Sequence, residues 1–134
     1  MKSESTNNDK LDVFLVEDSP LIREIILENL NSINGIQVVS YADTQSQALI
    51  NIEKHKPDLV IVDLELLEGN GLYVLTEIKH NPEKFGHPKK IVFTNHTSPL
   101  LKRKCESMDI HGFYDKSYQI DDMLDFIEDL TSTK

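Results

Sequence analysis

Strand and helix signals alternate five times along this chain, and this order constrains its fold more than any other feature. The expected strands cover residues 13–16, 36–42, 59–63, 91–94 and 112–115, and an amphipathic segment follows each of them. The third is apolar on both faces up to Asp63, which is typical of a parallel strand covered by helices on both sides. The pattern predicts a doubly wound α/β sandwich.

Helix starts are marked by local chemistry. Ser19 and Ser98 each precede a proline, which is a combination typical of an N-cap followed by the first helical position. Thr44 and Gln47 form a capping-box pattern, and helical spacing predicts the third helix over 71–79. The fourth is expected to reach about residue 108, and the segment 81–89 is expected to be a long surface loop.

Composition and charge indicate one domain with protein partners. The chain has 134 residues, 39% of them hydrophobic, and a formal net charge of −9. We expect a disordered polar arm over residues 1–10, a folded domain over 11–134 and no output domain. The negative charge argues against binding of nucleic acid or of an anionic membrane by this chain. A single cysteine and the lack of a long apolar run favour the cytoplasm.

Polar side chains gather just past the strand ends. Glu17 and Asp18 follow the first strand, Asp63 ends the third, Thr94 ends the fourth and Lys116 follows the fifth. Ligands of open α/β sheets bind outside the carboxyl ends of the strands, so these groups are expected to converge. Three clustered carboxylates repel one another, so either some stay protonated or a cation neutralises them, and an all-oxygen site beside water favours Mg²⁺.

This combination of groups suits phosphoryl chemistry. A carboxylate such as Asp63 can form an acyl phosphate when cations balance the charge on the transferred group. Lys116 would supply a positive charge, and Thr94 would supply a hydroxyl hydrogen bond to the phosphoryl oxygens.

The same residues resemble a known family. The sequence resembles the receiver domain of bacterial two-component response regulators, including the single-domain chemotaxis regulators. The resemblance rests on the acidic pair before Ser19-Pro20, the run from Lys56 to Asp63, Gly71, Thr94, and Lys116 just after the Gly-Phe-Tyr-Asp segment. The resemblance covers Asp12 to Leu130. It implies a flavodoxin-like (βα)5 fold with a five-stranded parallel sheet in the order 2-1-3-4-5, and a signalling switch rather than an enzyme.

The resemblance also implies roles for single residues. Asp63 would accept a phosphoryl group from a sensor histidine kinase or a histidine phosphotransfer protein. Asp18, Asp63 and the backbone carbonyl of Glu65 would bind Mg²⁺, and Glu17 would act through a metal-bound water.

A second set of residues would respond to the phosphoryl group. Thr94 and Phe113 would move as a switch and change the face built from the fourth helix, the fifth strand and the last helix. That face would bind an unknown downstream protein or a second copy of the chain.

Five positions depart from the family pattern or invite a further hypothesis. Glu17 stands where aspartate is commoner, and Asn95 stands where a small residue is usual after the threonine. Ser117 replaces a proline, which leaves open whether the Lys116–Ser117 bond is cis. Glu65 and His96 lie two residues beyond Asp63 and Thr94, and we expect them to set the lifetime of the phosphorylated state.

Other interpretations remain open. An aspartate-nucleophile phosphatase also uses Asp and Mg²⁺, although it usually has an acid/base aspartate where Glu65 stands. A flavin module would place phosphate beside Glu17 and Asp18, which would repel it. A pseudo-receiver would not need the complete set of site residues. We favour a stand-alone regulator, and the receiver part of a larger transcriptional regulator is the alternative.

Overall fold

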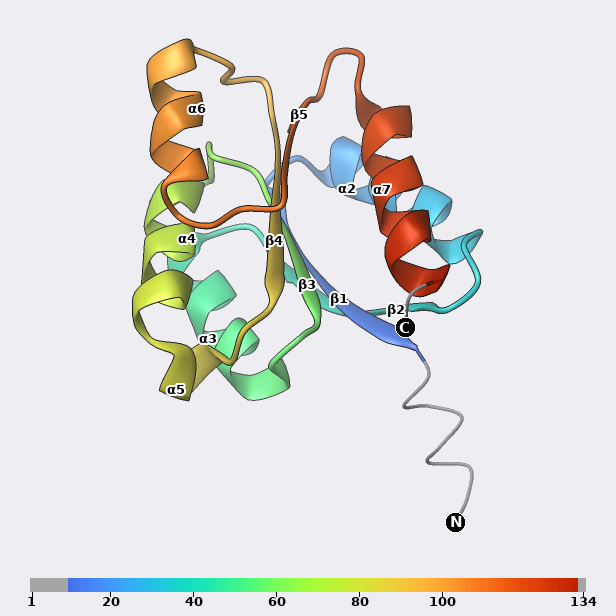
Figure 1. Cartoon of the computed structure of the whole chain (residues 1–134), viewed down its shortest axis with the longest axis horizontal. Helices are drawn as coiled ribbons and strands as arrows, with labels where there is room; N and C mark the ends of the chain where they lie inside the picture. The colour runs from blue at the N-terminus through green and yellow to red at the C-terminus, as the bar shows by residue number, and fades with distance from the viewer. Residues whose placement is uncertain (1–9, 133–134) are drawn as a thin grey trace.

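The computed structural model describes residues 10–132, which form a single parallel sheet between two layers of helices (Figure 1). The strands are β1 (Leu11–Val16), β2 (Ile36–Ala42), β3 (Leu59–Val62), β4 (Lys89–Thr94) and β5 (Gly112–Asp115). They pair in the order β2-β1-β3-β4-β5, and every pairing is parallel. The predicted fold and strand order are confirmed.

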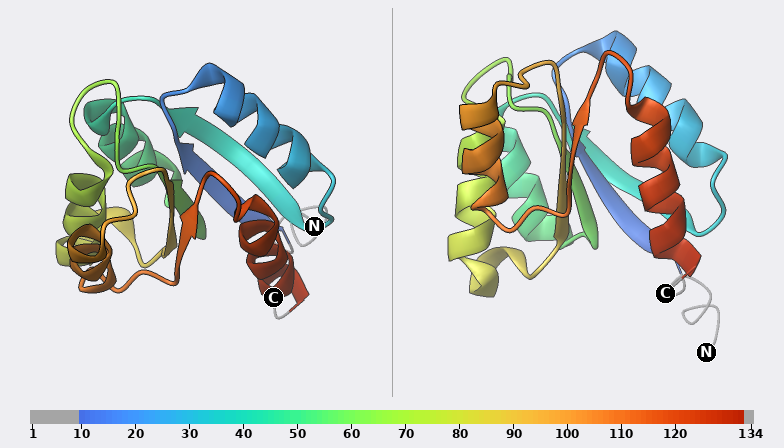
Figure 2. Two further views of the ribbon diagram at one scale, coloured as in Figure 1. Left: turned by 90° about the horizontal axis from the view of Figure 1, so that it is seen from above. Right: turned by 45° about the horizontal axis from the view of Figure 1, so that its top comes forward.

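Helices cover both faces of this sheet (Figure 2). One face carries α2 (Pro20–Asn31) and α7 (Ile120–Ser132), and the other carries α3 (Gln45–His55), α4 (Gly71–His80) and α6 (Pro99–Glu106). Alternate strand residues enter two separate cores, because successive side chains of a strand point to opposite faces. Val60 and Val62 pack on the α3–α4 side, whereas Leu59 and Ile61 pack on the α2–α7 side.

The predicted helix starts are present. The side chains of Ser19, Thr44 and Ser98 accept hydrogen bonds from the backbone N–H groups three residues later, at 3.3, 3.1 and 3.2 Å respectively. Each cap satisfies one of the N–H groups that a first helical turn leaves without a partner. These caps fix where the chain leaves the carboxyl edge of the sheet.

The predicted loop over residues 81–89 is wrong in part, because it contains the short helix α5 (Pro82–Phe85). Pro82 takes a position at the start of the helix that needs no N–H donor. Phe85 is only 1% exposed and packs in the core beside α4. Burial of this ring folds a segment that proline and glycine alone would mark as a loop.

The remaining differences are small. Helix α6 ends at Glu106, two residues before the predicted end, where Ser107 caps it. No helix of residues 10–132 is both long and apolar enough to cross a membrane. The predicted disordered arm falls on residues 1–10, of which 1–9 lie outside the described part of the chain.

Candidate functional site

Backbone pairing brings the strand ends together at one edge of the sheet. The N–H of Asp63 donates to the carbonyl of Val16 at 2.9 Å, and the N–H of Lys116 donates to the carbonyl of Thr94 at 3.0 Å. The N–H of Glu17 likewise donates to the carbonyl of Ala42 at 2.9 Å. These contacts extend the parallel ladders by one step, so backbone hydrogen bonds to the sheet hold Glu17, Asp63 and Lys116 in place.

Three carboxylates converge there, as the sequence predicts. Oxygen atoms of Glu17, Asp18 and Asp63 lie within 4.8 Å of one another. Glu17 and Asp63 are buried, at 1% and 4% exposed, while Asp18 is half-buried. Hard oxygen ligands with one side open to water fit Mg²⁺, which keeps several of its waters. The donor set therefore suits this ion.

Lys116 lies between two of these acids. Its ammonium is 2.9 Å from a carboxylate oxygen of Glu17 and 2.9 Å from Oδ2 of Asp63, and its side chain is largely buried. The contact with Asp63 agrees with the expected convergence of the site. The contact with Glu17 was not predicted, and it gives the lysine two acids to neutralise in place of one.

Burial and charge shift the protonation equilibria of this pair. Burial raises the pKa of Glu17, and nearby Asp63 adds to the effect, although the hydrogen bond from Lys116 opposes it. For Lys116, burial lowers the pKa, but the hydrogen bonds to Glu17 and Asp63 outweigh it and the pKa is raised overall. Lys116 is therefore a cation throughout the neutral range, and the pKa of Glu17 lies above that of an ordinary glutamate.

Glu17→Gln is expected to make the protein more stable near neutral pH when no divalent cation is present. The raised pKa of Glu17 means that the folded state binds this proton more tightly than the unfolded state. The protonated Glu17 side chain therefore stabilises the folded state at low pH. This stabilisation is lost as the pH rises from 4.5, the ordinary pKa of a glutamate, through the higher pKa that Glu17 has in the folded protein. Glutamine keeps an oxygen for Lys116 but cannot ionise.

Urea unfolding between pH 4 and 8 in chelator checks this prediction. The stability gained by Glu17→Gln should grow with pH and vanish toward pH 4. Glu28→Gln, at an exposed position of α2, is the matched control and should stay within about 0.5 kcal/mol of the wild type. A wild type that gains stability over Glu17→Gln as the pH rises would contradict the prediction.

A pocket of about 240 Å³ opens beside the acids. Its walls include Asp18, Asp63, Asn95, His96 and Lys116. Thr94 is fully buried, and its hydroxyl accepts a hydrogen bond from the N–H of His96 at 3.1 Å. Asn95 does line the pocket, at the place where the sequence departs from the family pattern.

Glu65 and His96 meet at the mouth of this pocket. Nε2 of His96 is 3.1 Å from Oε1 of Glu65, and both side chains are exposed. The N–H of Glu65 also donates to Oδ1 of Asp63 at 3.3 Å, which fixes the start of the loop. The sequence places both residues near the site, but their direct contact is a structural finding.

Phe113 lies outside the pocket. It is half-buried and packs against the α3–α4 core, and the ammonium of Lys102 lies 5.7 Å from its ring centroid. The Lys116–Ser117 bond is trans, as are all peptide bonds of the described residues. The buried thiol of Cys105 has its pKa raised to about 11 by burial, so it is not a nucleophile here.

Sequence reasoning missed one residue that supports the site, Arg23, and gave no packing reason for another, Gly71. Arg23 donates to the backbone carbonyl of Glu17 at 3.0 Å, and its guanidinium lies 4.3 Å from the ring centroid of Tyr41. Gly71 approaches the backbone of Asp63 so closely that a Cβ there would lie 2.1 Å from the Asp63 carbonyl oxygen. Gly71 belongs to the sequence motif, but its spacing alone does not give this packing reason.

Comparison with known proteins agrees with this geometry. The family model described as the response regulator receiver domain matches residues 13–128. A protein-glutamate methylesterase/protein-glutamine glutaminase of Desulfotalea psychrophila is 30% identical over 77% of this chain and 28% of its own length. The probable C4-dicarboxylate response regulator DctR of Priestia megaterium is 31% identical over 54% of this chain and 32% of its own length.

Solved structures share the fold. The signal receiver domain of a putative Luxo repressor protein from Vibrio parahaemolyticus has a TM-score of 0.81 at 24% identity, covering 92% of both chains. That of the putative response regulator NarL from Mycobacterium tuberculosis has a TM-score of 0.80 at 22% identity, covering 93% of this chain and 98% of the other. The chain spans less than a third of the curated relatives named above. It belongs to the response regulator receiver domain family.

Proposed function

We propose that this chain is a phosphorylation-activated signalling switch whose phosphoryl acceptor is Asp63. The observation that carries the proposal is the ammonium of Lys116, held 2.9 Å from the Asp63 carboxylate inside a cluster of three acids. An aspartate with a purely structural role needs only one cationic partner or a position as a helix N-cap. Here a buried nucleophile, a fixed lysine and an oxygen-rich cation site lie together beside an open pocket.

In the proposed reaction, a carboxylate oxygen of Asp63 attacks the phosphorus of a phosphohistidine on a sensor kinase or a phosphotransfer protein. A new P–O bond forms as the P–N bond breaks, and the imidazole leaves with its electron pair and takes up a proton. Mg²⁺ bound by Asp18, Asp63 and the backbone carbonyl of Glu65, with Glu17 acting through a water, would neutralise charge on the phosphoryl oxygens.

Lys116 acts as the internal cation of this step. Its ammonium has three N–H donors, and two of them are used by Glu17 and Asp63. When a carboxylate oxygen of Asp63 is phosphorylated, the Lys116 ammonium can keep its hydrogen bond to Glu17 and direct another N–H toward a phosphoryl oxygen. The positive charge therefore stays at the site before and after transfer, which limits reorganisation.

Thr94 and Phe113 would transmit the change. The Thr94 hydroxyl accepts from the N–H of His96 and donates to no other group of residues 10–132, so its proton can be donated to a phosphoryl oxygen. A shift of Thr94 moves the end of β4, which pairs with β5 up to Thr94 and Asp115. Phe113 lies on β5, the strand paired with β4. The face formed by α6, β5 and α7 is therefore the expected binding surface for a downstream protein or a second copy of the chain.

Incubation with Mg²⁺ and a small acyl phosphate tests this function. Intact mass spectrometry should show one added phosphoryl group on the wild type, dependent on the divalent cation. Steady release of phosphate from a phosphomonoester, with no modified protein, would instead support the phosphatase alternative. Absence of any modification would support an interaction module that lacks the switch.

Exchanging both Glu65 and His96 for alanine is expected to shorten the lifetime of the phosphorylated protein severalfold. The two side chains are in contact across the mouth of the Asp63 pocket, so they restrict the approach of water. Decay of the phosphorylated mass after removal of the donor measures this rate. Ser46→Ala, at an exposed position on α3, is the control, and an unchanged decay rate in the double variant would show the idea to be wrong.

A further inference from the structure

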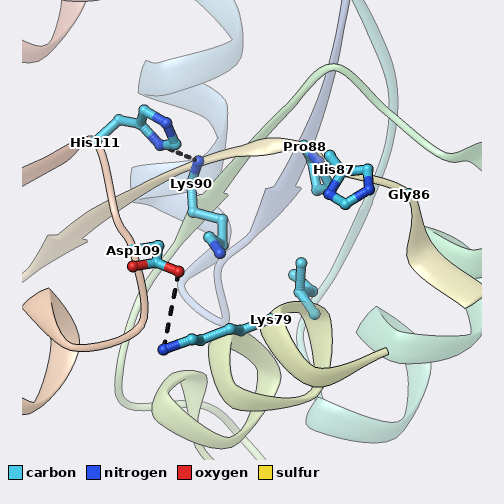
Figure 3. Close-up of a pocket in the computed structure, with 8 residues that line it drawn as sticks. Lys79, Gly86, His87, Pro88, Lys90, Asp109 and His111 are labelled. Carbon is cyan, nitrogen blue, oxygen red and sulfur yellow. Dashed lines mark hydrogen bonds and ion pairs between the residues drawn. The ribbon is translucent and has the colours of Figure 1, made fainter. Parts of the chain in front are cut away.

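A second polar pocket lies at the opposite end of β4 from Thr94. Figure 3 shows the residues that line it. It has a volume of about 270 Å³ and lies among the end of α4, the connection from α5 to β4 and the loop before β5. Its walls are Ile78, Lys79, Gly86, His87, Pro88, Lys90, Asp109 and His111. Pockets for drug-sized ligands start at about 300 Å³, so this one suits a smaller molecule.

Lys90 is the unusual residue of this pocket. Only 6% of it is exposed, although lysine is almost never buried without a partner. Its backbone is fixed on both sides by His111, whose Nδ1 accepts from the Lys90 N–H at 3.2 Å and whose N–H donates to the Lys90 carbonyl at 2.7 Å. The second position of β4 therefore directs this side chain into the pocket.

The ammonium of Lys90 has no hydrogen bond or ion pair with any residue of the described range 10–132. None of the fully enclosed side-chain N or O atoms in that range lacks a partner, so this ammonium is not sealed inside the protein. It faces the hollow between Asp109 and Lys79 (Figure 3). A lysine that only packs its stem on the surface would carry its charge out into solvent.

The charges around Lys90 leave the pocket positive. Asp109 is 3.8 Å from the ammonium of Lys79, which also donates to the carbonyl of Ser107 at 2.8 Å. Lys79, Lys90 and Asp109 give a net charge of +1 with both imidazoles neutral, in a chain whose formal net charge is −9.

The pKa values agree with a positive, partly desolvated pocket. Burial lowers the pKa of Lys90, and Lys79 lowers it further while Asp109 opposes the change. Burial and the charges of Lys89 and Lys90 lower the pKa of His111. An anion in the pocket would relieve both effects.

We propose that this pocket binds a small phosphate-type oxyanion, with the Lys90 ammonium as its central donor and Lys79 and an imidazole of His87 or His111 as further donors. Lys90 offers three N–H donors, and the two lysines supply the charge that a phosphate requires. The site is separate from Asp63, because Lys90 and Thr94 are four residues apart on one strand, a distance of about 13 Å. The proposal does not depend on phosphoryl transfer.

Titration of the magnesium-free protein with inorganic phosphate, followed by backbone amide NMR at constant ionic strength in chloride, tests this site. We expect saturable shifts at Lys79, Lys90 and His111, and about tenfold weaker binding in Lys90→Met, which loses a charged hydrogen bond. Lys104→Met removes a charge from an exposed position on α6 that does not line the pocket, and should bind as the wild type does.

Glycerol phosphate in place of inorganic phosphate distinguishes a free ion from a phosphate group carried by a larger molecule, and saturable binding of either one supports the site.

The variant with methionine in place of the buried Lys90 should fold, since methionine fills the same space without a charge. Lys79→Met, at the end of α4, gives a second variant that should also weaken binding. Shifts confined to Asp63 and Lys116, shifts no larger than chloride produces, or wild-type affinity in both Lys90→Met and Lys79→Met would overturn the proposal.

Discussion

Replacing Lys116 with methionine is expected to lower the stability of the magnesium-free protein by about 3 kcal/mol at pH 7, because one partner of a buried charge cluster is removed. The ammonium lies 2.9 Å from both Glu17 and Asp63, and both acids are almost fully buried. Its raised pKa means that this contribution is complete at neutral pH and is lost only as the pH rises through the folded pKa, in the alkaline range.

The same variant should lose phosphoryl acceptance by roughly 10²- to 10³-fold, the usual effect of removing one preorganised donor from a site of developing negative charge. Chemical denaturation and the initial rate of modification by a small acyl phosphate measure the two effects. The loss of stability should shrink as Glu17 takes up a proton at lower pH, and it should also shrink when Mg²⁺ replaces the missing charge. Lys116→Arg, which keeps the charge, is the control, and a methionine variant as stable as the wild type at pH 7 would contradict the role given to Lys116.

Gly71→Ala is expected to cost about 1–3 kcal/mol of stability, the usual effect of overpacking a filled site, and to reduce phosphorylation of the folded protein. An added Cβ would lie 2.1 Å from the carbonyl oxygen of Asp63 and 2.7 Å from Cγ1 of Val62. The nearest atom is backbone, so the chain at Asp63 must move. The Gly71 N–H also donates to the Leu64 carbonyl at 3.0 Å, which ties the two segments together.

Gly86→Ala separates the two effects of the Gly71 substitution. Gly86 has φ +79°, a conformation that alanine rarely adopts, but no atom lies within 4 Å of its hypothetical Cβ. This variant should lose stability through backbone strain and still accept phosphate at Asp63 at the wild-type rate. Thermal unfolding and the modification assay distinguish the variants. Equal modification rates for the two alanine variants under conditions where both are folded would contradict the packing role of Gly71.

The positions of the strands and the edge that holds the site could be predicted because both depend on local patterns, whereas the strand order came from the family resemblance. Apolar runs identify strands, and Ser-Pro pairs mark where helices begin, so the residue after each strand can be located within one or two positions. Parallel strands then bring those residues to one edge. Glu17, Asp18, Asp63 and Lys116 meet there, as that reasoning requires.

Other features depend on contacts that spacing does not encode. Glu17 and Lys116 are 99 residues apart, and their pairing follows from side-chain length and burial. Helix α5 forms because Phe85 finds space in the core, and a short segment with two prolines gives no periodic signal for that. Lys90 precedes the predicted fourth strand and carries no sequence signal, and only its burial and its backbone contacts with His111 mark the second pocket.

Chemical trapping of the acyl phosphate tests the central claim most directly. Borohydride reduces an aspartyl phosphate to homoserine, so peptide mass spectrometry after phosphorylation and reduction identifies the residue that carried the phosphoryl group. We predict homoserine at position 63 in the wild type and none anywhere in Asp63→Asn. Homoserine at position 18 in the wild type, or equal trapping in Asp63→Asn, would contradict the assignment of Asp63 as the acceptor.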